Sequence, residues 1–401
     1  MDLPEGWVTA IWSDVVVITH GQNQREIASL DGIYPIYGSG GEIGRATKSL
    51  CKAGSTVIGR KGTIDRPFFT HTDFWNIDTA FGITPNEGML SRFFFAFCQY
   101  FNFKTLDHSS GRPSLTQSNL YGIKMPLPPL AEQQRIVEKL DELFSRLDKG
   151  VETLQIIKNQ LKTYRQAVLK RLYSWEIPSE LGIDIDKTIK VNDLCSSISD
   201  GDHQAPPQVK QGIPFLVISN ITSGKVNYKS KRFVSEDYYY NLDSKRIPKT
   251  GDVLYSVTGS FGIPAIVESD RPFCVQRHIA MLRPSNVLSK YLFYMMQTPQ
   301  IYLMARTIAT GTAQLTVPIR GLRQLRIPMP RNEKEQYKIV AAIESRLSVC
   351  DNLEAGADES LAKAKALRQS ILKKAFTGQL VPQDPNDEPA DKLLERIQRK
   401  R

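Results

Sequence analysis

Cysteine and long apolar runs are scarce in this sequence of 401 residues. The five cysteines are odd in number, widely separated and without a C-x-x-C pair; they are Cys51, Cys98, Cys195, Cys274 and Cys350. This pattern argues against a disulfide framework or a zinc site, so a reducing compartment fits best. No run reaches the roughly 18 apolar residues of a membrane span, and the opening MDLPEGW lacks the apolar core of a signal peptide. The sequence therefore predicts a soluble, cytoplasmic protein with no membrane partner.

Recognisable catalytic and metal-binding motifs are also missing. The five histidines are isolated, with neither H-x-x-x-H nor H-E-x-x-H spacing. The acidic stretch DGDH at residues 200–203 has too few ligands for calcium or magnesium. The sequence contains no Asn-Pro-Pro-aromatic tetrapeptide, the mark of an adenine-methylating site. We therefore expect no catalytic residue and no metal ligand in this chain, and no enzyme that acts alone.

A glycine-rich stretch, YPIYGSGGEIGRAT at residues 34–47, raises the question of a nucleotide cradle. Its glycines do not have the G-x-G-x-x-G spacing of a dinucleotide fingerprint, and no Gly-Lys-Ser/Thr ending of a P-loop follows. Two interpretations stay open at this point. The stretch is either a flexible surface loop or a loop whose bare backbone approaches another molecule closely.

The net charge of +10 is unevenly distributed along the chain. Residues 1–129 contain 11 basic and 11 acidic side chains, whereas residues 176–331 contain 19 basic and 13 acidic ones. A basic excess favours polyanionic partners such as nucleic acid. Phosphate contacts in the first segment must therefore come from local placement of its basic residues.

The sequence repeats itself at an offset of about 200 residues. EQQRIV at 132–137 recurs as EQYKIV at 335–340, and YRQAVLKRLY at 164–173 recurs as LRQSILKKAF at 367–376. Farther upstream, GSTVIGRKGTI at residue 54 parallels GDVLYSVTGSF at residue 251, and GRPSLT at residue 111 parallels GTAQLT at residue 311. Each half therefore consists of a mixed globular domain followed by a long helix.

The two helices have heptad patterns typical of a coiled coil. In the first, one core position is filled by Leu140, Leu147, Leu154, Leu161 and Val168, and the second by Leu143, Ile157 and Tyr164. In the second, the corresponding residues are Ile343, Cys350, Ala357, Ala364 and Ile371, with Leu353 and Leu367 at the second position. The first helix leads into the second globular domain and the second helix leaves it, so helices that pair within the chain must be antiparallel.

The predicted fold class is α+β, with two mixed α/β domains joined by two long antiparallel helices that form a coiled coil with a pseudo-twofold repeat. The boundaries are a first domain at 1–129, a long helix at 130–175, a second domain at 176–331, a C-terminal long helix at 332–378 and a tail at 379–401. Two related surfaces on a dimer-like core match the design of proteins that read two half-sites in duplex DNA.

At the level of motifs, the chain resembles the specificity (S) subunits of type I restriction-modification systems. The resemblance covers nearly the whole chain and is carried by PLPPLAEQQRIVEKLDEL at 126–143, by its degenerate copy PMPRNEKEQYKIVAAIESRL at 328–347, and by LPEGW at 3–7. DGDHQAP at 200–206 and GIPFLVISNITSGKV at 212–226 also contribute. The resemblance implies two target-recognition domains, each reading one half of a bipartite, asymmetric DNA site, with the helices spacing them.

The same resemblance implies which partners and cofactors to expect. Methyltransferase (M) subunits, two in number, would dock on the helices, and restriction (R) subunits would join the complex. This subunit would be non-catalytic and without a cofactor, although methylation and DNA cleavage by the complex would require it. S-adenosylmethionine, ATP and Mg²⁺ would be bound by the partner subunits.

Candidate contacts follow from the loops that would face a DNA groove. Arginine suits guanine, lysine suits phosphate, and hydroxyl and amide groups can reach base edges. The predicted DNA contacts are Ser39, Arg45, Arg60, Lys61, Thr63, Arg112, His203, Thr258, Ser260, Gln276, Arg277, His278 and Gln314. The predicted M-docking residues, on a helix flank beside the seam, are Phe144, Val151 and Leu172.

Two other interpretations of the chain compete with this one. A helical interaction scaffold would bind protein partners instead of DNA. A lone S-adenosylmethionine-dependent methyltransferase would bind that cofactor itself. Binding of S-adenosylmethionine by the isolated chain would favour the lone methyltransferase over a specificity subunit. Sequence-specific DNA binding would favour the specificity subunit over the scaffold.

Overall fold

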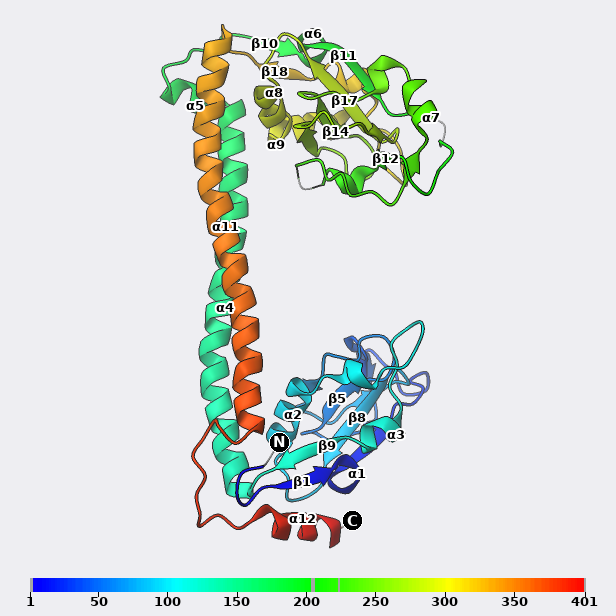
Figure 1. The fold of residues 1–401 in the computed structure, drawn as a ribbon, viewed down its shortest axis with the longest axis vertical. Helices are drawn as coiled ribbons and strands as arrows, with labels where there is room; N and C mark the ends of the chain where they lie inside the picture. Colours follow the sequence, from blue (N-terminus) through cyan, green and yellow to red (C-terminus); the bar gives the residue numbers. More distant parts are fainter. Residues whose placement is uncertain (1–2, 203–205, 223, 400–401) are drawn as a thin grey trace. The chain divides into compact units, whose positions relative to one another are not determined.

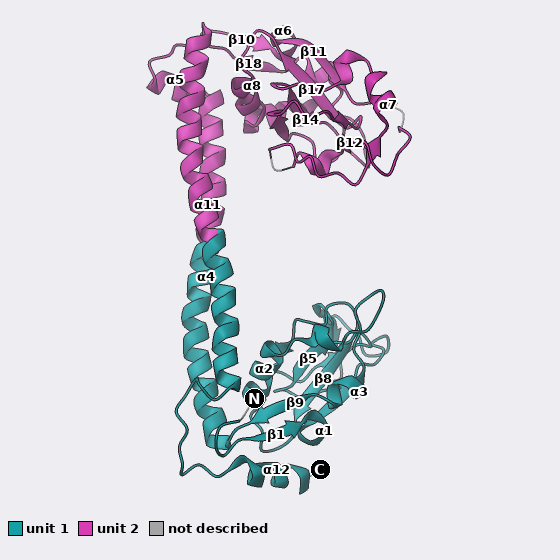
Figure 2. Cartoon of the chain, in the orientation of Figure 1, with its two compact units in different colours: residues 1–154, 358–401 teal, residues 155–357 magenta. Residues whose placement is uncertain are grey.

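The computed structural model describes residues 3–202, 206–222 and 224–399. The chain divides into two compact units (Figure 2). Unit 1 comprises Met1–Leu154 and Asp358–Arg401, and unit 2 comprises Gln155–Ala357. Each unit contains a globular part and a stretch of both long helices, α4 (Leu130–Tyr173) and α11 (Glu333–Phe376) (Figure 1). The predicted α+β class and the two long helices are confirmed.

Unit 1 contains three small sheets. The strand orders are β2-β8-β5-β6, β4-β3-β7 and β1-β9. The strands are β1 (Val8–Ile11), β2 (Val16–His20), β3 (Tyr34–Gly38), β4 (Gly41–Ala46), β5 (Thr56–Gly59), β6 (Phe68–Phe69), β7 (Trp75–Asn76), β8 (Ala80–Pro85) and β9 (Lys124–Leu127). The helices besides the long pair are α1 (Trp12–Val15), α2 (Ser91–Tyr100), α3 (Gln117–Tyr121) and α12 (Ala390–Arg399), with a 3-10 turn η1 (Phe103–Leu106).

Aromatic side chains build the core of unit 1 where α2 meets the long helices. Phe93 and Phe97 of α2 are buried, and each ring centroid lies 5.3 Å from that of Phe376 near the end of α11. Trp12 of α1 is fully buried against Phe94 at 4.9 Å. These contacts join the N-terminal strands, α2 and the end of α11 in one apolar cluster.

Unit 2 repeats this layout. Its sheets have the orders β11-β17-β14-β15, β13-β12-β16 and β10-β18. The strands are β10 (Thr188–Lys190), β11 (Cys195–Asp200), β12 (Ile213–Leu216), β13 (Phe233–Val234), β14 (Val253–Ser256), β15 (Pro264–Ile266), β16 (Cys274–Val275), β17 (Ile279–Pro284) and β18 (Arg326–Pro328). The helices are α5 (Glu176–Glu180), α6 (Val191–Leu194), α7 (Glu236–Tyr240), α8 (Ser289–Met296), α9 (Pro299–Ile308) and α10 (Ile319–Leu322), with 3-10 turns η2 (Ile218–Asn220) and η3 (Ser244–Arg246).

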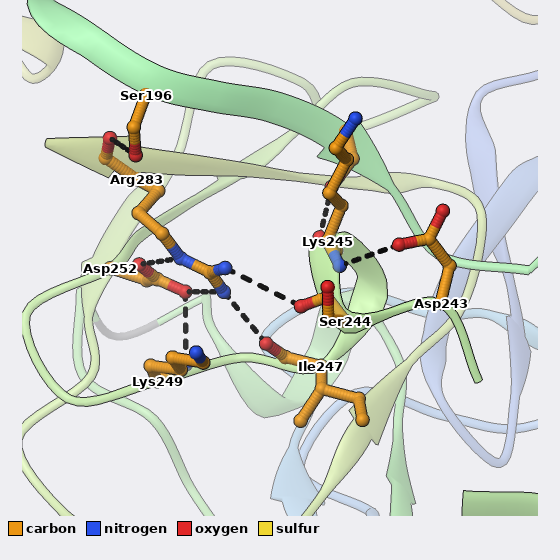
Figure 3. A network of polar contacts seen from close by, with 9 residues as sticks. Ser196, Asp243, Ser244, Lys245, Ile247, Lys249, Asp252 and Arg283 are labelled. Atoms are coloured by element: carbon orange, nitrogen blue, oxygen red, sulfur yellow. Dashed lines mark hydrogen bonds and ion pairs between the residues drawn. The ribbon is translucent and has the colours of Figure 1, made fainter. Parts of the chain in front are cut away.

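A polar network fixes the segment around η3 to the sheet of unit 2 (Figure 3). Arg283 of β17 donates to both carboxylate oxygens of buried Asp252, at 3.1 and 2.9 Å, and to the carbonyl of Ile247 at 2.8 Å. The same carboxylate accepts the backbone N–H of Lys249 at 2.9 Å. Because a buried charge is stable only when paired and hydrogen-bonded, this Arg–Asp pair holds the segment 244–249 in place.

The long helices pack antiparallel within each unit. In unit 1, Asp148 of α4 is paired with Arg368 of α11, and in unit 2 Arg165 of α4 is paired with Asp351 of α11 at 2.5 Å. The residue numbers of the two pairs have the same sum, so both units use one antiparallel register. Asp148 and Asp351, like Arg165 and Arg368, are separated by 203 residues, the offset of the helical repeat.

The second core position predicted for the helices is wrong at three of its five residues, whereas Leu143 and Ile157 are half-buried. Tyr164, Leu353 and Leu367 are 50%, 53% and 51% exposed. In α11 the less exposed row lies four residues after the first core position and includes Leu347 and Leu361. The i+4 side chains include Arg165 and Arg368, whose ion pairs with Asp351 and Asp148 of the other long helix hold that row beside the partner.

The C-terminal segment, predicted only as a tail, contains a helix that completes unit 1. Leu393 and Ile397 of α12 are 2% and 1% exposed and belong to the core of unit 1. The backbone N–H of Ala390 donates to the carbonyl of Gly6 at 2.9 Å, and Asp387 pairs with Arg135 at 2.6 Å. The apolar spacing of Leu393, Leu394 and Ile397 is the signal of this helix in the sequence.

Candidate nucleic-acid interface

Three chain segments of unit 1 are joined by backbone hydrogen bonds at one end of β5 and β8. Arg60 donates its N–H to the carbonyl of Thr79 at 2.7 Å, and its own carbonyl accepts from Leu115 at 2.8 Å. The N–H of Gly62 donates to the carbonyl of Pro113 at 2.8 Å. We call residues 59–64, 77–80 and 111–115 the loop cluster of unit 1.

This cluster contains four of the six DNA contacts predicted in unit 1, and a fifth, Ser39, borders it. The four are Arg60, Lys61, Thr63 and Arg112. A Cβ atom added to Gly62, whose φ is +88°, would lie 2.9 Å from Nη2 of Arg112, so the guanidinium covers this glycine. Arg60 donates to the carbonyl of Asp78 at 3.1 Å, and the backbone of Ser39 donates to the Thr79 hydroxyl at 3.4 Å. The side chain of Lys61 is exposed.

The sixth predicted contact, Arg45, lies outside this cluster on β4. Its Nε pairs with Glu42 at 3.1 Å. The glycine-rich stretch that contains it forms a β-hairpin of β3 and β4, with Gly38 opposite Gly41. It is therefore neither a phosphate cradle nor an irregular loop.

Unit 2 forms the same cluster from different side chains. Val257 donates to the carbonyl of His278 at 2.9 Å and accepts from Val317 at 2.7 Å, and Gly259 donates to Leu315 at 2.9 Å. A Cβ atom on Gly259, whose φ is +67°, would lie 2.8 Å from Nε2 of Gln314. We call residues 256–261, 276–279 and 313–317 the loop cluster of unit 2.

The hydrogen bonds establish which residues of the two clusters correspond. Lys61 matches Thr258, since each forms an isolated antiparallel bridge, to Ser114 and to Thr316 respectively. The same matching pairs Thr63 with Ser260, Thr79 with His278, and Arg112 with Gln314. The repeat alignment of GRPSLT with GTAQLT was therefore wrong by two residues, because it matched Arg112 with Thr312.

Two predicted contacts in unit 2 have intramolecular roles in the structure. Thr258 is only 5% exposed, and its hydroxyl lies 3.3 Å from that of Thr316. The prediction that it reaches DNA is corrected, because a buried hydroxyl with a partner cannot do so without rearrangement. Gln276 donates its backbone N–H to Leu216 at 3.0 Å and keeps a half-exposed side chain.

The remaining predicted contacts of unit 2 differ in their surroundings. Ser260, Arg277 and Gln314 are exposed. Burial, and secondarily the charge of Arg277, lowers the pKa of His278 below its ordinary value, so its imidazole is neutral near pH 7. His203 lies outside the described residues. The sequence analysis did not predict that Thr79 and Thr316 belong to the loop clusters. Their only signal in the sequence is their position near glycine-containing loops.

The acidic stretch at residues 200–202 is occupied by intramolecular partners. Asp202 accepts from the phenol of Tyr238 at 2.8 Å and from the guanidinium of Arg246 at 3.0 Å. Burial is the main cause that raises the pKa of Tyr238. Within the described ranges, no group of three or more His, Cys, Asp or Glu side chains could hold a metal ion.

Among the predicted docking residues, one is inaccessible. Leu172 is fully buried in the core of unit 2, so it offers no surface to a partner. The reason is that the end of α4 packs against the globular part of unit 2. Val151 is half-buried, and the ring of Phe144 lies under the guanidinium of Arg368 at 4.1 Å.

Each unit has a cavity between its globular part and the long helices. The cavity of unit 1, about 300 Å³, is lined by α2, α4 and α11, and includes Gln99 and Phe144. The cavity of unit 2, about 220 Å³, is lined by the corresponding α8, α11 and α4, with Gln297 and Leu347, and also by Gly224, Lys225, Ile266 and Glu268. We call these the twin cavities.

Matched ion pairs border the twin cavities. Arg92 pairs with Asp141 at 2.6 Å in unit 1, and Lys290 pairs with Glu344 at 2.7 Å in unit 2. The Asp148–Arg368 and Arg165–Asp351 pairs border them on the long helices. The two cavities thus have corresponding helical walls and matched ion pairs, and the cavity of unit 2 has an additional wall that contains Lys225 and Glu268. The side chains of the two loop clusters, in contrast, differ.

In the part of the chain that the structure describes, we find no helix with the length and apolar character needed to cross a membrane.

Comparisons with known proteins add to this geometry. A family model described as "Type I restriction modification DNA specificity domain" matches residues 4–162 and 187–363. The chain is 27% identical over 316 residues to the type I restriction enzyme EcoBI specificity subunit of Escherichia coli, which covers 72% of this chain and 66% of that protein, just under two thirds. It is 24% identical over 452 residues to the EcoKI specificity subunit of Escherichia coli strain K12, covering 100% of this chain and 96% of that protein.

One solved structure is similar over almost the full length. It is described as the structural basis of complex assembly and conformational transition of the type I R-M system. The TM-score is 0.71 at 20% identity, covering 95% of this chain and 100% of that one. At this identity the likeness concerns the fold alone.

Proposed function

The chain belongs to the family of type I restriction-modification DNA specificity domains, and we propose that its two units each read one part of a split, asymmetric sequence in double-stranded DNA. One observation carries the proposal. The same backbone cluster occurs in both units, while the side chains at matched positions differ, with Lys61, Thr63 and Arg112 corresponding to Thr258, Ser260 and Gln314. A shared backbone arrangement that displays different side chains suits the recognition of two different half-sites.

The matched pair Arg112 and Gln314 suggests how the two parts differ. Each side chain covers a glycine with positive φ at the same place in its cluster. Arginine pairs in bidentate fashion with guanine, and glutamine pairs with adenine in the major groove. We therefore assign guanine to Arg112 and adenine to Gln314. Lys61 is free to approach a phosphate, which supplies affinity in a unit without a bulk positive charge.

The twin cavities support docking of two M subunits, one on each unit. A feature built twice with the same ion pairs suits two copies of one partner, whereas the loop clusters suit two different DNA sequences. Because the charges that border each cavity are paired, the half-buried rings of Phe95 in unit 1 and Phe293 in unit 2 are left for an apolar side chain of the partner. The long helices would then hold the two reading surfaces at a set spacing.

Catalysis belongs to the partners in this proposal. The chain is a non-catalytic specificity subunit, M subunits use S-adenosylmethionine, and R subunits use ATP and Mg²⁺. The complex acts in the cytoplasm. The alternative is a protein-binding scaffold, which the exposed Tyr164, Leu353 and Leu367 on the long helices would suit.

Mapping methylated adenines tests the DNA-reading proposal. The chain is expressed with its M partner in a host without other adenine methyltransferases, and the modified sequence is read genome-wide. We expect one split sequence with two different parts and a fixed spacer. Random methylation, or none despite an assembled complex, would favour the scaffold.

Blocking the twin cavities tests the docking proposal. Gln99→Trp and Gln297→Trp place a bulky side chain in the cavity of unit 1 and unit 2, and native mass spectrometry counts the M subunits. Each variant should lose one M, and the double variant both. Ser118→Trp, at an exposed position on α3, is the control. Retention of two M subunits by the double variant would exclude these cavities as docking sites.

A further inference from the structure

The hairpin of β3 and β4 in unit 1 contains a β-bulge with an exposed aliphatic side chain. Ile36 is opposite Gly44 and Tyr37 is opposite Glu42, so Ile43 is the extra residue of the bulge. Its side chain is 54% exposed, and β4 is the edge strand of its sheet. Bulges re-aim side chains and occur next to functional sites. Ile43 therefore points away from the core at a sheet edge whose position is fixed.

The glycines around Ile43 leave the backbone bare on its outer side. At Gly40 an added Cβ atom would meet no described heavy atom within 4 Å, and at Gly44 it would make only an ordinary contact of 3.9 Å. Neither glycine has a positive φ. In contrast, a Cβ atom on Gly59 would lie 1.9 Å from a backbone oxygen, so the fold requires that glycine. The fold has no such need at 40 and 44, where the missing side chains give another molecule close access to the strand.

The hairpin is continuous with the loop cluster of unit 1. Ser39 at its tip donates its N–H to the Thr79 hydroxyl at 3.4 Å, and its Cβ lies 3.1 Å from the position of a Cβ atom on Gly59. A duplex that contacts Arg60 and Lys61 therefore extends over the hairpin. This step rests on the proposed function.

The charges on the hairpin are paired with each other, so the aliphatic side chain of Ile43 is the hairpin's distinctive group for binding. Glu42 and Arg45 form an ion pair at 3.1 Å on either side of Ile43. The major groove admits a two-stranded β-ribbon, and its one aliphatic group is the 5-methyl of thymine. We infer that Ile43 contacts the methyl group of a thymine in the part of the DNA site read by unit 1.

Unit 2 has a different structure at this place. Residues 217–232 separate β12 from β13, and Val234 of β13 is fully buried opposite Ile213. The thymine contact is therefore expected in one part of the site only.

Thymine-to-deoxyuridine replacement tests the contact, because deoxyuridine pairs with adenine but lacks the methyl group. The complex with M subunits is titrated, by fluorescence anisotropy at one salt concentration, against duplexes in which each thymine of the split sequence is replaced in turn. One replacement, in the part read by unit 1, should weaken binding by about fourfold, the factor for burying one methyl-sized group. Ile43→Ala should bind the thymine duplex equally weakly and should not respond to that replacement.

Val17→Ala is the matched control, because Val17 is 53% exposed on β2 of the same unit. It should keep the wild-type affinity and the response to deoxyuridine. If Ile43→Ala responds to deoxyuridine as the wild type does, or if no thymine replacement weakens wild-type binding, the inference is overturned and the proposed function is not. Weaker M assembly in both Ile43→Ala and Leu30→Ala without DNA also overturns it. Leu30 is a fully exposed aliphatic residue of unit 1, and this result would make the region a protein interface. A complex without sequence preference overturns the proposed function as well.

Discussion

The loop clusters of units 1 and 2 have the same backbone hydrogen bonds but different side chains. Arg60 and Val257 occupy the same position, each donating to the second segment and accepting from the third. The comparison teaches that the cluster depends on main-chain pairing and on glycines with positive φ, at Gly62 and Gly259. Side chains on such a frame can change without loss of the fold, which is what a surface that reads variable sequences requires.

The helical walls of the twin cavities are alike in the two units, whereas α12 and the β3–β4 hairpin are not. The cavities have matched ion pairs in both units, whereas α12 belongs to unit 1 and the β3–β4 hairpin corresponds in unit 2 to β12 and β13 with a longer connection. This contrast is what we expect if, as proposed, two copies of one partner dock in the twin cavities. The predictions below test these distinctions, beginning with the largest expected effect.

Lengthening the helices should change the preferred spacer of the DNA site. Because both units use one antiparallel register, a heptad inserted after Leu147 must be matched by one after Arg368, where the register places its partner. Seven residues add about 10.5 Å, or roughly 3 base pairs. A methylation assay over a library of spacers should show loss at the original spacer and a longer optimum, with weaker binding because the second part also rotates about the duplex.

An unchanged spacer at full activity would show that the helices do not set the distance. The control is insertion into α4 alone, which disrupts the register and should abolish assembly.

Removing a core contact of α12 should destabilise unit 1 selectively. Leu393→Ala should lower the free energy of unfolding by roughly 2–5 kcal/mol, because it leaves a cavity in a packed core. Hydrogen exchange followed by mass spectrometry should show faster exchange in the sheets of unit 1 and not in those of unit 2. Lys392→Ala, an exposed neighbour on α12, is the control. Equal effects in both units would mean that α12 does not belong to unit 1 alone.

A small pH effect should distinguish the matched residues Glu132 and Glu335. Burial raises the pKa of Glu132 above its ordinary value despite hydrogen bonds from Trp7 and Gln383, whereas Glu335 caps the N–H of Arg331 at 2.9 Å. The folded chain then holds this proton at a pH at which the unfolded chain has released it. Stability from Glu132 therefore falls as pH rises from the ordinary pKa of 4.5 through the raised one.

Glu132→Gln should remove this decline in thermal unfolding temperature as the pH rises above 4.5. Glu335→Gln should leave it in place. A decline that persists in Glu132→Gln would assign it to another group.

Much of the architecture followed from sequence periodicity. The repeat EQQRIV/EQYKIV and the heptads predicted two long helices, because a packed helix needs an apolar row at a constant period. Tyr164, Leu353 and Leu367 were misassigned because in these heptads the i+4 side chain, and not the i+3 side chain, lies beside the partner helix.

The candidate site was predicted in part. Glycines and basic residues pointed to Arg60, Lys61 and Arg112, which the fold does bring together. The burial of Thr258 and Leu172 depends on tertiary packing, which a local pattern does not encode. The bulge at Ile43 depends on strand register, which a local sequence pattern does not determine either.

The central claim is that matched positions in the two units read different parts of one DNA site. The most direct test maps methylated adenines for Arg112→Gln and Gln314→Arg, each expressed with M. Arg112→Gln should relax or change the preference at one position in only one part of the site, and Gln314→Arg at one position in only the other, each by about 1–3 kcal/mol. A uniform loss of methylation at all sequences, or changes in both parts from either variant, would contradict the claim.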